Sequence, residues 1–288
     1  MRSGILSSAS KLEPIARQSL VRIWFWAFIS VSTLQGCNDS AIEQTQVASG
    51  KKSEEQPLSA FEIRNDQVFY KGKLVGTLPD SSLKKAQKTL EVAGFYPKLP
   101  DGILVPEITP LPDGRIWLSG GVGKNNTYSS QTWFYNPSTN QLEKGPNLKN
   151  ESIKHATLVL SDGKVLLSGG STARPIEIGL VSILDPTTNV IESLGSLVFP
   201  RYEHSMVELA PNVIAITGGA TRNGDQDEVE IFDLEKKKSR MVGHLSLPRK
   251  QHQSLKIDQN QVLVFQGKGF EYTGKELGPE VFVIPENK

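Results

Sequence analysis

The chain has 288 residues, of which 38 % are hydrophobic, and its formal net charge is +1. This composition excludes an intrinsically disordered chain, and the balanced charge gives no electrostatic reason to expect nucleic acid as a partner. The 25 glycines and 17 prolines are typical of a β protein rich in turns.

A secretory signal is predicted for residues 1–36. The first 22 residues carry four basic side chains against one acidic side chain, and residues 23–36, IWFWAFISVSTLQG, carry no charge. A helix over that uncharged stretch rises only about 21 Å, which is short of a bilayer core of roughly 30 Å. A basic start and a short apolar segment are typical of a signal peptide rather than a transmembrane helix.

The uncharged stretch ends in LQGC, which resembles the lipobox of bacterial lipoproteins. The resemblance implies that Cys37 becomes the lipid-modified first residue of the mature protein, and that the protein is exported and held on a membrane of the bacterial cell envelope. The alternative is an ordinary signal peptide with an incidental cysteine. Cys37 is the only cysteine, so an intramolecular disulfide is excluded.

Residues 37–58 are polar and predict a flexible tether between the lipid and the folded part. The next region, residues 59–100, is predicted to contain a hairpin and a short helix. Apolar and polar residues alternate over residues 61–78 on both sides of a Lys-Gly pair, which favours the hairpin.

The short helix is predicted over residues 81–93. Its Leu83, Ala86, Leu90 and Ala93 share one helical face. Ser81 or Ser82 is expected to cap its start, and Gly94 suits its end.

Residues 101–288 repeat a common pattern. The segments RIWLSGG, KVLLSGG, VIAITGG and QVLVFQGK align when Gly120, Gly169, Gly218 and Gly267 are superposed at intervals of 49 residues. Gly121, Gly170 and Gly219 complete three diglycines, whereas Lys268 follows Gly267. A third strand follows in every unit and a weaker fourth strand in three of them, so each unit is predicted to be an antiparallel meander whose last copy lacks its fourth strand.

The diglycine, the strand number and the period together resemble Kelch repeats, which form the blades of a β-propeller. The resemblance implies an all-β fold with a Kelch-type propeller of about four blades. Three arrangements stay open: a small ring completed by an N-terminal strand, an open arc that self-associates through exposed strand edges, or a fragment of a longer gene.

Ligand binding is expected at the loops on one face, because a rigid scaffold with variable loops is a common form of binding site. Arginine and amide groups there suit carboxylates or sugar hydroxyls. The candidates that we expect around this mouth are Lys124, Asn125, Asn126, Arg174, Arg201, Arg222, Asp225 and Arg249.

Three histidines stand at matching places, His155, His204 and His252. Because scaffold residues recur from unit to unit whereas catalytic residues do not, we interpret them as structural. Two alternatives remain, namely ligand contact by His204 and His252 or a three-histidine zinc site. We predict no metal and no cofactor.

The functional hypothesis is an envelope-anchored module that binds a protein or a glycan. The alternative is a carbohydrate-active enzyme of the sugar mutarotase or epimerase type, because some Kelch-type propellers are sugar enzymes. A galactose-oxidase-like copper centre is excluded, because it needs a cysteine cross-linked to a tyrosine and Cys37 lies outside the repeats. A third possibility is an incomplete gene product with no independent role.

Overall fold

A computed structural model describes residues 61–96, 98–99, 101–174, 176–269 and 277–285. The described residues belong to one compact unit of the chain and are mostly β-strand, with one α-helix among them. The predicted all-β class is therefore confirmed. The predicted signal peptide, Cys37 and the tether of residues 37–58 lie outside the described residues. No helix in the described part is long and apolar enough to cross a membrane.

The N-terminal part is a three-stranded antiparallel sheet, β1 (Phe61–Arg64), β2 (Gln67–Tyr70) and β3 (Lys73–Thr77). The predicted hairpin turns at Lys71-Gly72, and a second turn at Asn65-Asp66 adds the strand that sequence reasoning did not separate. All four turn residues have φ between 49° and 73°. Two successive residues with positive φ are the mark of a type I′ turn, whose twist suits a tight hairpin.

The helix α2 spans Pro79–Val92, two residues earlier than predicted at its start and one residue earlier at its end. The expected serine cap is wrong: Leu78 is the N-cap, and no side chain caps the helix. Pro79 explains the earlier start, because its fixed φ favours the first helical position and it has no N–H to satisfy. Leu90 and Ala86 are buried, and Gly94 follows the helix with a φ of +79°.

Four further sheets follow the predicted meander, each with its strands in chain order. They are the first sheet, β4 (Glu107–Pro110), β5 (Ile116–Ser119), β6 (Thr132–Asn136) and β7 (Gln141–Lys144); the second sheet, β8 (Ala156–Val159), β9 (Val165–Ser168), β10 (Leu180–Asp185) and β11 (Val190–Ser196); the third sheet, β12 (Ser205–Ala210), β13 (Val213–Thr217), β16 (Glu228–Asp233) and β17 (Lys238–His244); and the fourth sheet, β18 (Gln253–Lys256), β19 (Gln261–Phe265) and β20 (Glu280–Val283). The fourth sheet has three strands in the described residues, as predicted.

The loops between second and third strands also contain short elements. They are the 3₁₀ turn η3 (Lys124–Asn126) and the small ribbon of β14 (Ala220–Thr221) and β15 (Gly224–Asp225).

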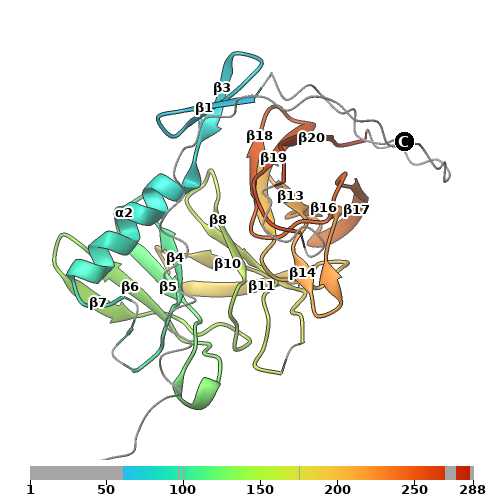
Figure 1. The fold of residues 1–288 in the computed structure, drawn as a ribbon. Coiled ribbons are helices and arrows are strands. Elements are labelled where there is room, and N and C mark those ends of the chain that lie inside the picture. Colours follow the sequence, from blue (N-terminus) through green and yellow to red (C-terminus); the bar gives the residue numbers. More distant parts are fainter. Residues whose placement is uncertain (1–60, 97, 100, 175, 270–276, 286–288) are drawn as a thin grey trace, which may run out of the picture. The chain divides into compact units, whose positions relative to one another are not determined.

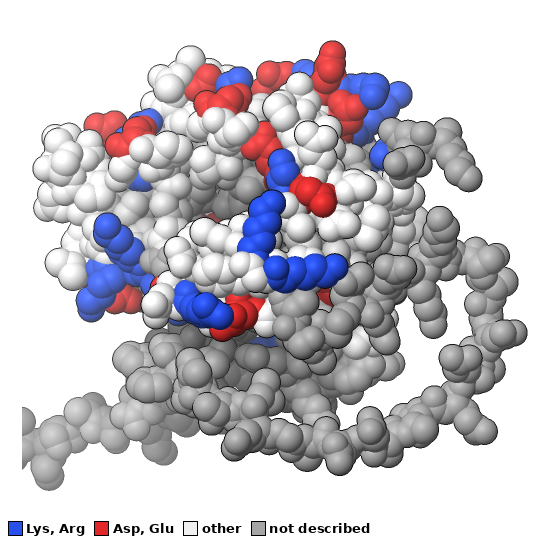
Figure 2. Space-filling model, turned by 90° about the horizontal axis from the view of Figure 1, so that it is seen from above, with Lys and Arg blue, Asp and Glu red and all other residues white. Residues whose placement is uncertain are grey.

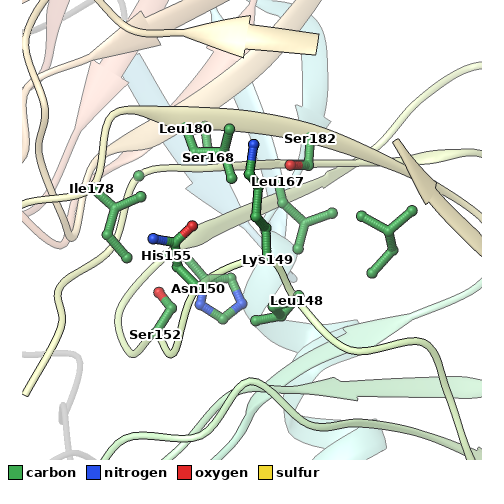
Figure 3. A pocket seen from close by; sticks show the side chains of 12 residues that line it. Leu148, Lys149, Asn150, Ser152, His155, Leu167, Ser168, Ile178, Leu180 and Ser182 are labelled. Atoms are coloured by element: carbon green, nitrogen blue, oxygen red, sulfur yellow. The ribbon is translucent and has the colours of Figure 1, made fainter. Parts of the chain in front are cut away.

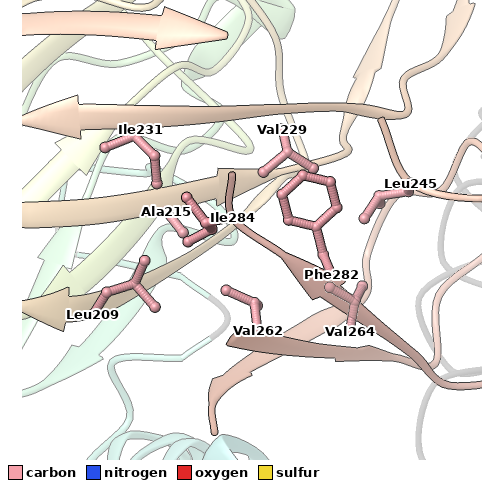
Figure 4. Packing of buried hydrophobic residues seen from close by; sticks show 9 residues of the cluster. All are labelled: Leu209, Ala215, Val229, Ile231, Leu245, Val262, Val264, Phe282 and Ile284. Carbon is pink, nitrogen blue, oxygen red and sulfur yellow. The ribbon is translucent and has the colours of Figure 1, made fainter. Parts of the chain in front are cut away.

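The core lies between successive sheets rather than within one of them. The first strands contact one another in chain order, β4 with β8, β8 with β12, and β12 with β18. Figure 4 shows such a contact, in which Leu209, Ala215 and Ile231 of the third sheet face Val262 and Phe282 of the fourth sheet.

The N-terminal elements contact the two ends of this series. Helix α2 packs on the first sheet, where Leu90 joins Ile116 and Leu118. The β1–β3 sheet packs on the fourth sheet, where Val68 joins Phe265. In Figure 1 the helix accordingly lies beside β4–β7, and β1–β3 lies beside β18–β20.

Candidate ligand site

A cavity of about 660 Å³ lies among the first strands. Residues of β4, β8, β12 and β18 line it, together with the start of α2. The face of the molecule in Figure 2 has a hollow bordered largely by uncharged residues, and its acidic and basic side chains are interspersed. A surface without a large patch of one sign gives no long-range electrostatic attraction toward a polyanion.

The three matched histidines tie neighbouring sheets together. Each imidazole Nε2 lies 2.7–2.8 Å from a hydroxyl at the end of the second strand of the preceding sheet. The pairs are Ser119 with His155, Ser168 with His204, and Thr217 with His252. The recurrence of this bond at three junctions supports the structural interpretation of these side chains.

The diglycine makes room for two of these histidines at once, as Gly169-Gly170 shows. A Cβ on Gly169 would lie 2.6 Å from His204 Cε1, in the next sheet, and 2.3 Å from the backbone oxygen of Arg201. A Cβ on Gly170 would lie 3.1 Å from His155 Cβ, in its own sheet. Their φ values of 66° and 107° also favour glycine.

The fourth unit corrects the predicted alignment by one residue. Gln266 and Gly267 have φ values of 61° and 93°, so they occupy the two positions of the diglycine. Gly267 faces His252 of its own sheet, as Gly170 faces His155, and both glycines follow their histidine by 15 residues. The strand that ends before Gln266 packs on the N-terminal sheet, where Phe265 meets Phe61, rather than on another repeat with a histidine.

Burial keeps the histidines neutral. It lowers the pKa of His155 to about 4. Burial and the neighbouring Arg249 lower the pKa of His252 to about 3, and burial holds the pKa of His204 well below its ordinary value. The Nδ1 atoms are buried without a hydrogen-bond partner. Within the described residues, no three His, Cys, Asp or Glu side chains group as a metal site requires.

Two predicted mouth residues are core residues instead. Arg201 and Arg249 are 0 % and 1 % exposed, so their placement at the rim is wrong. The Arg201 guanidinium donates to Glu230 at 2.7 Å and to the backbone oxygen of Gly218 at 2.6 Å. Arg249 donates to Glu280 at 2.6 Å. Each arginine turns inward because a glutamate on the third strand of its own sheet supplies the opposite charge.

Asp225 is also buried, rather than exposed at the expected mouth. Its side chain is 2 % exposed, and its carboxylate lies 2.9 Å from the Lys250 ammonium. The remaining candidates, Lys124, Asn125, Asn126, Arg174 and Arg222, are exposed on the loops after the second strands. The backbone N–H of Arg222 donates a hydrogen bond to the Glu177 carboxylate, and this bond joins the loops of the second and third sheets.

Sequence reasoning missed Glu107, which lines the cavity at the start of β4. Burial raises the pKa of Glu107 to about 7; the nearby Glu203 adds to this rise, whereas Lys154 opposes it. Lys154 forms an ion pair with Glu203 at 2.8 Å, and Gln251 donates to the same carboxylate at 2.8 Å. An acidic residue at the start of an otherwise uncharged first strand was the available signal.

Comparison with known proteins identifies a related fold but no family. No family model matches the sequence, and no curated protein matches it. A solved structure described as "Structure of YjhT" is similar, with a TM-score of 0.51 and 18 % sequence identity. The match covers 60 % of this chain and 61 % of that chain, so it spans less than two thirds of that protein. At this identity the similarity is one of fold alone.

Proposed function

We propose that this chain is a Kelch-type propeller of four blades, held on the bacterial envelope by a lipid on Cys37, and that it binds a protein or glycan ligand through its loops. The contacts of the first strands in chain order support four blades around one cavity. The N-terminal sheet and α2 then fill the space between the fourth and first blades, because they pack on those two sheets.

The exposed loop cations carry the binding proposal. The polar groups that recur from repeat to repeat are used by the scaffold: the histidines bind hydroxyls, and Arg201 and Arg249 bind glutamates. Lys124, Arg174 and Arg222 are exposed on the loops that follow the second strands. Exposed cations on loops held by a rigid scaffold suit a carboxylate-bearing or hydroxyl-rich ligand.

An array of glycans and envelope proteins, probed with the detergent-solubilised full chain, tests the binding role. A triple variant with alanine at Lys124, Arg174 and Arg222 is expected to lose at least tenfold in affinity for any ligand found. A matched triple variant with alanine at Lys236, Lys237 and Lys238, on the turn before β17 and at its first residue, is expected to bind like the wild type. Equal binding by both variants would exclude the loop face.

The anchor is tested separately. Cys37→Ala is expected to move the protein from the membrane fraction to the soluble fraction. The same variant should leave the ligand affinity of the solubilised protein unchanged. Retention of this variant in the membrane would exclude the lipid anchor.

Glu107 favours an enzyme of the mutarotase type as a second candidate. A carboxyl group with a pKa near neutrality, next to a cavity of about 660 Å³, has the properties of a general acid–base. Anomerisation of free sugars followed by NMR would show turnover by the wild type and loss of at least a hundredfold in Glu107→Gln. Absence of turnover across hexoses and sugar acids would reject this candidate.

A further inference from the structure

A pocket of about 30 Å³ lies in the second sheet. The equivalent position in the third sheet and in the fourth sheet is occupied by a buried ion pair. Ser152 stands three residues before His155, as Arg201 stands three residues before His204. Ser182 pairs with Leu167 on β9, as Glu230 pairs with Ile216 on β13. The second sheet therefore has two serines at the positions of an arginine and a glutamate.

The backbone around this pocket is already arranged to bind a carboxylate. In the third sheet, the amides of Val198 and Phe199 donate to the Glu230 carboxylate at 2.8 and 3.0 Å. The corresponding amides in the second sheet belong to Lys149 and Asn150, which line the pocket, and no hydrogen bond from them is found within the described residues.

The same carboxylate–amide contact recurs in the fourth sheet, where Ser246 donates its N–H to Glu280 at 2.7 Å. The second sheet is thus the one among the last three that has the amides without the acid.

Five of the twelve residues that line the pocket are leucine or isoleucine, and the polar ones suit an anion. Ser152 Oγ is buried and has no hydrogen-bond partner, and Figure 3 shows Ser152 and Ser182 on opposite sides of the pocket. Lys149 and Asn150 are exposed, so the pocket reaches the surface at its positively charged side. A volume of about 30 Å³ holds roughly two water-sized groups, which matches the two oxygens of a carboxylate.

We propose that this pocket binds the carboxylate group of a small organic anion. The ligand would accept hydrogen bonds from the amides of Lys149 and Asn150 and from the serine hydroxyls, and the Lys149 ammonium would supply the opposite charge. The pocket lies beside the loop that carries Arg174, but it uses none of the exposed loop cations of the proposed function, so its test is independent of that proposal.

Amide shifts in the full chain test the site directly. The protein is labelled with ¹⁵N-lysine and solubilised in detergent, and the Lys149 amide is assigned through Lys149→Arg. Sodium formate is expected to shift this amide saturably, whereas sodium chloride at equal ionic strength is not. No saturable shift up to about 100 mM formate, or an equal shift with chloride, would overturn the proposal.

A variant that refills the pocket gives the matched control. The double variant Ser152→Arg with Ser182→Glu restores the ion pair of the third sheet, so the apparent formate affinity is expected to fall at least tenfold. Thr188→Glu, at an exposed position on the turn between β10 and β11, adds the same charge outside the pocket and is expected to bind like the wild type. If the double variant does not fold, Ser182→Glu alone serves. Unchanged formate binding in the refilled pocket would also overturn the proposal.

Discussion

The junction between the second and third sheets differs from the boundary between the fourth sheet and the N-terminal sheet. At the junction, Ser168 meets His204, and a glycine leaves space for the imidazole ring. At the boundary, Phe265 stands at the position of that serine and packs on Phe61 at 5.4 Å between ring centroids. The junction uses a buried hydrogen bond that fixes geometry, and the boundary uses apolar contact.

The first sheet shows the complementary change. Pro106 stands where the later units have their histidine, and it lies under Gly121 as the histidines lie under their own glycines. In the described residues, helix α2 packs on the first sheet, rather than the second strand of another repeat, so the hydroxyl that serves the other histidines is not supplied there by a repeat. The repeat therefore keeps its polar tie only where two repeats meet, and it uses apolar residues where a repeat meets another kind of element.

The largest expected effect breaks the apolar boundary. Phe265→Ala removes a side chain that is 1 % exposed, so it is expected to cost about 3–5 kcal/mol of unfolding free energy, because it loses apolar burial and leaves a cavity. Urea unfolding measures the loss. Val283→Ala, on the exposed side of the same sheet, is the control and is expected to stay within about 0.5 kcal/mol. A small loss in Phe265→Ala would show that the N-terminal sheet contributes little.

The next largest effect on stability distinguishes Gly169, which lies beside a histidine of the next sheet, from Gln266, which takes the same position in the fourth unit. Gly169→Gln is expected to cost at least about 2 kcal/mol, because a side chain there has a positive φ and collides with the Arg201 carbonyl and with His204. Gln266→Gly is expected to change stability by less than about 1 kcal/mol. Thermal unfolding of both variants checks the contrast, which similar losses would contradict.

A smaller effect is expected from the histidine tie itself. His204→Ala removes the partner of the buried Ser168 hydroxyl and is expected to cost about 1–3 kcal/mol. His244→Ala is the control, because His244 is exposed at the end of β17. Urea unfolding compares the two variants. Equal losses would mean that the tie does not stabilise the junction.

The smallest effect appears in the dependence of stability on pH. Because the folded-state pKa of His155 is lowered to about 4, its contribution is complete above its unfolded pKa of about 6.5 and is lost as the pH falls toward 4. The slope from one such group is about 1.4 kcal/mol per pH unit. His155→Asn is expected to flatten the stability curve between pH 6 and 4, measured by urea unfolding, and an unchanged slope would exclude this cause.

Glu107 contributes with the opposite sign and provides an internal check. Its raised pKa of about 7 means that its contribution is complete below pH 4 and is lost as the pH rises through 7. Glu107→Gln is therefore expected to raise stability at pH 8 relative to the wild type. A fall in stability at pH 8 would show that the Glu107 carboxylate is stabilising when it is charged.

The sequence predicted the elements and the repeat well because both depend on local patterns. Strand positions follow the alternation and the turn residues. The recurrence of the histidines predicted a structural role, and each of them lies within hydrogen-bond distance of a hydroxyl in the preceding sheet. The alignment of Gly267 was wrong because glycine identity, rather than backbone conformation, was matched.

The predicted binding site was only partly right for a different reason. An exposed arginine and a buried arginine have the same local sequence pattern, and what distinguishes them is a partner that is distant in the chain. Arg201 is buried because Glu230 lies 29 residues later on a strand that folds back beside it. The pocket of the second sheet could not be predicted either, because it depends on Ser152 and Ser182, which are distant in the chain, lining the same pocket.

The sequence by itself determined the all-β class, the four units and the positions of their strands, because hydrophobic periodicity and turn residues act over a few residues. Only the tertiary structure decided which polar groups serve the scaffold and which remain for a ligand. The reason is that burying a charge is costly unless an opposite charge meets it. The partner for each buried arginine comes from another strand, which the folded sheet brings to it.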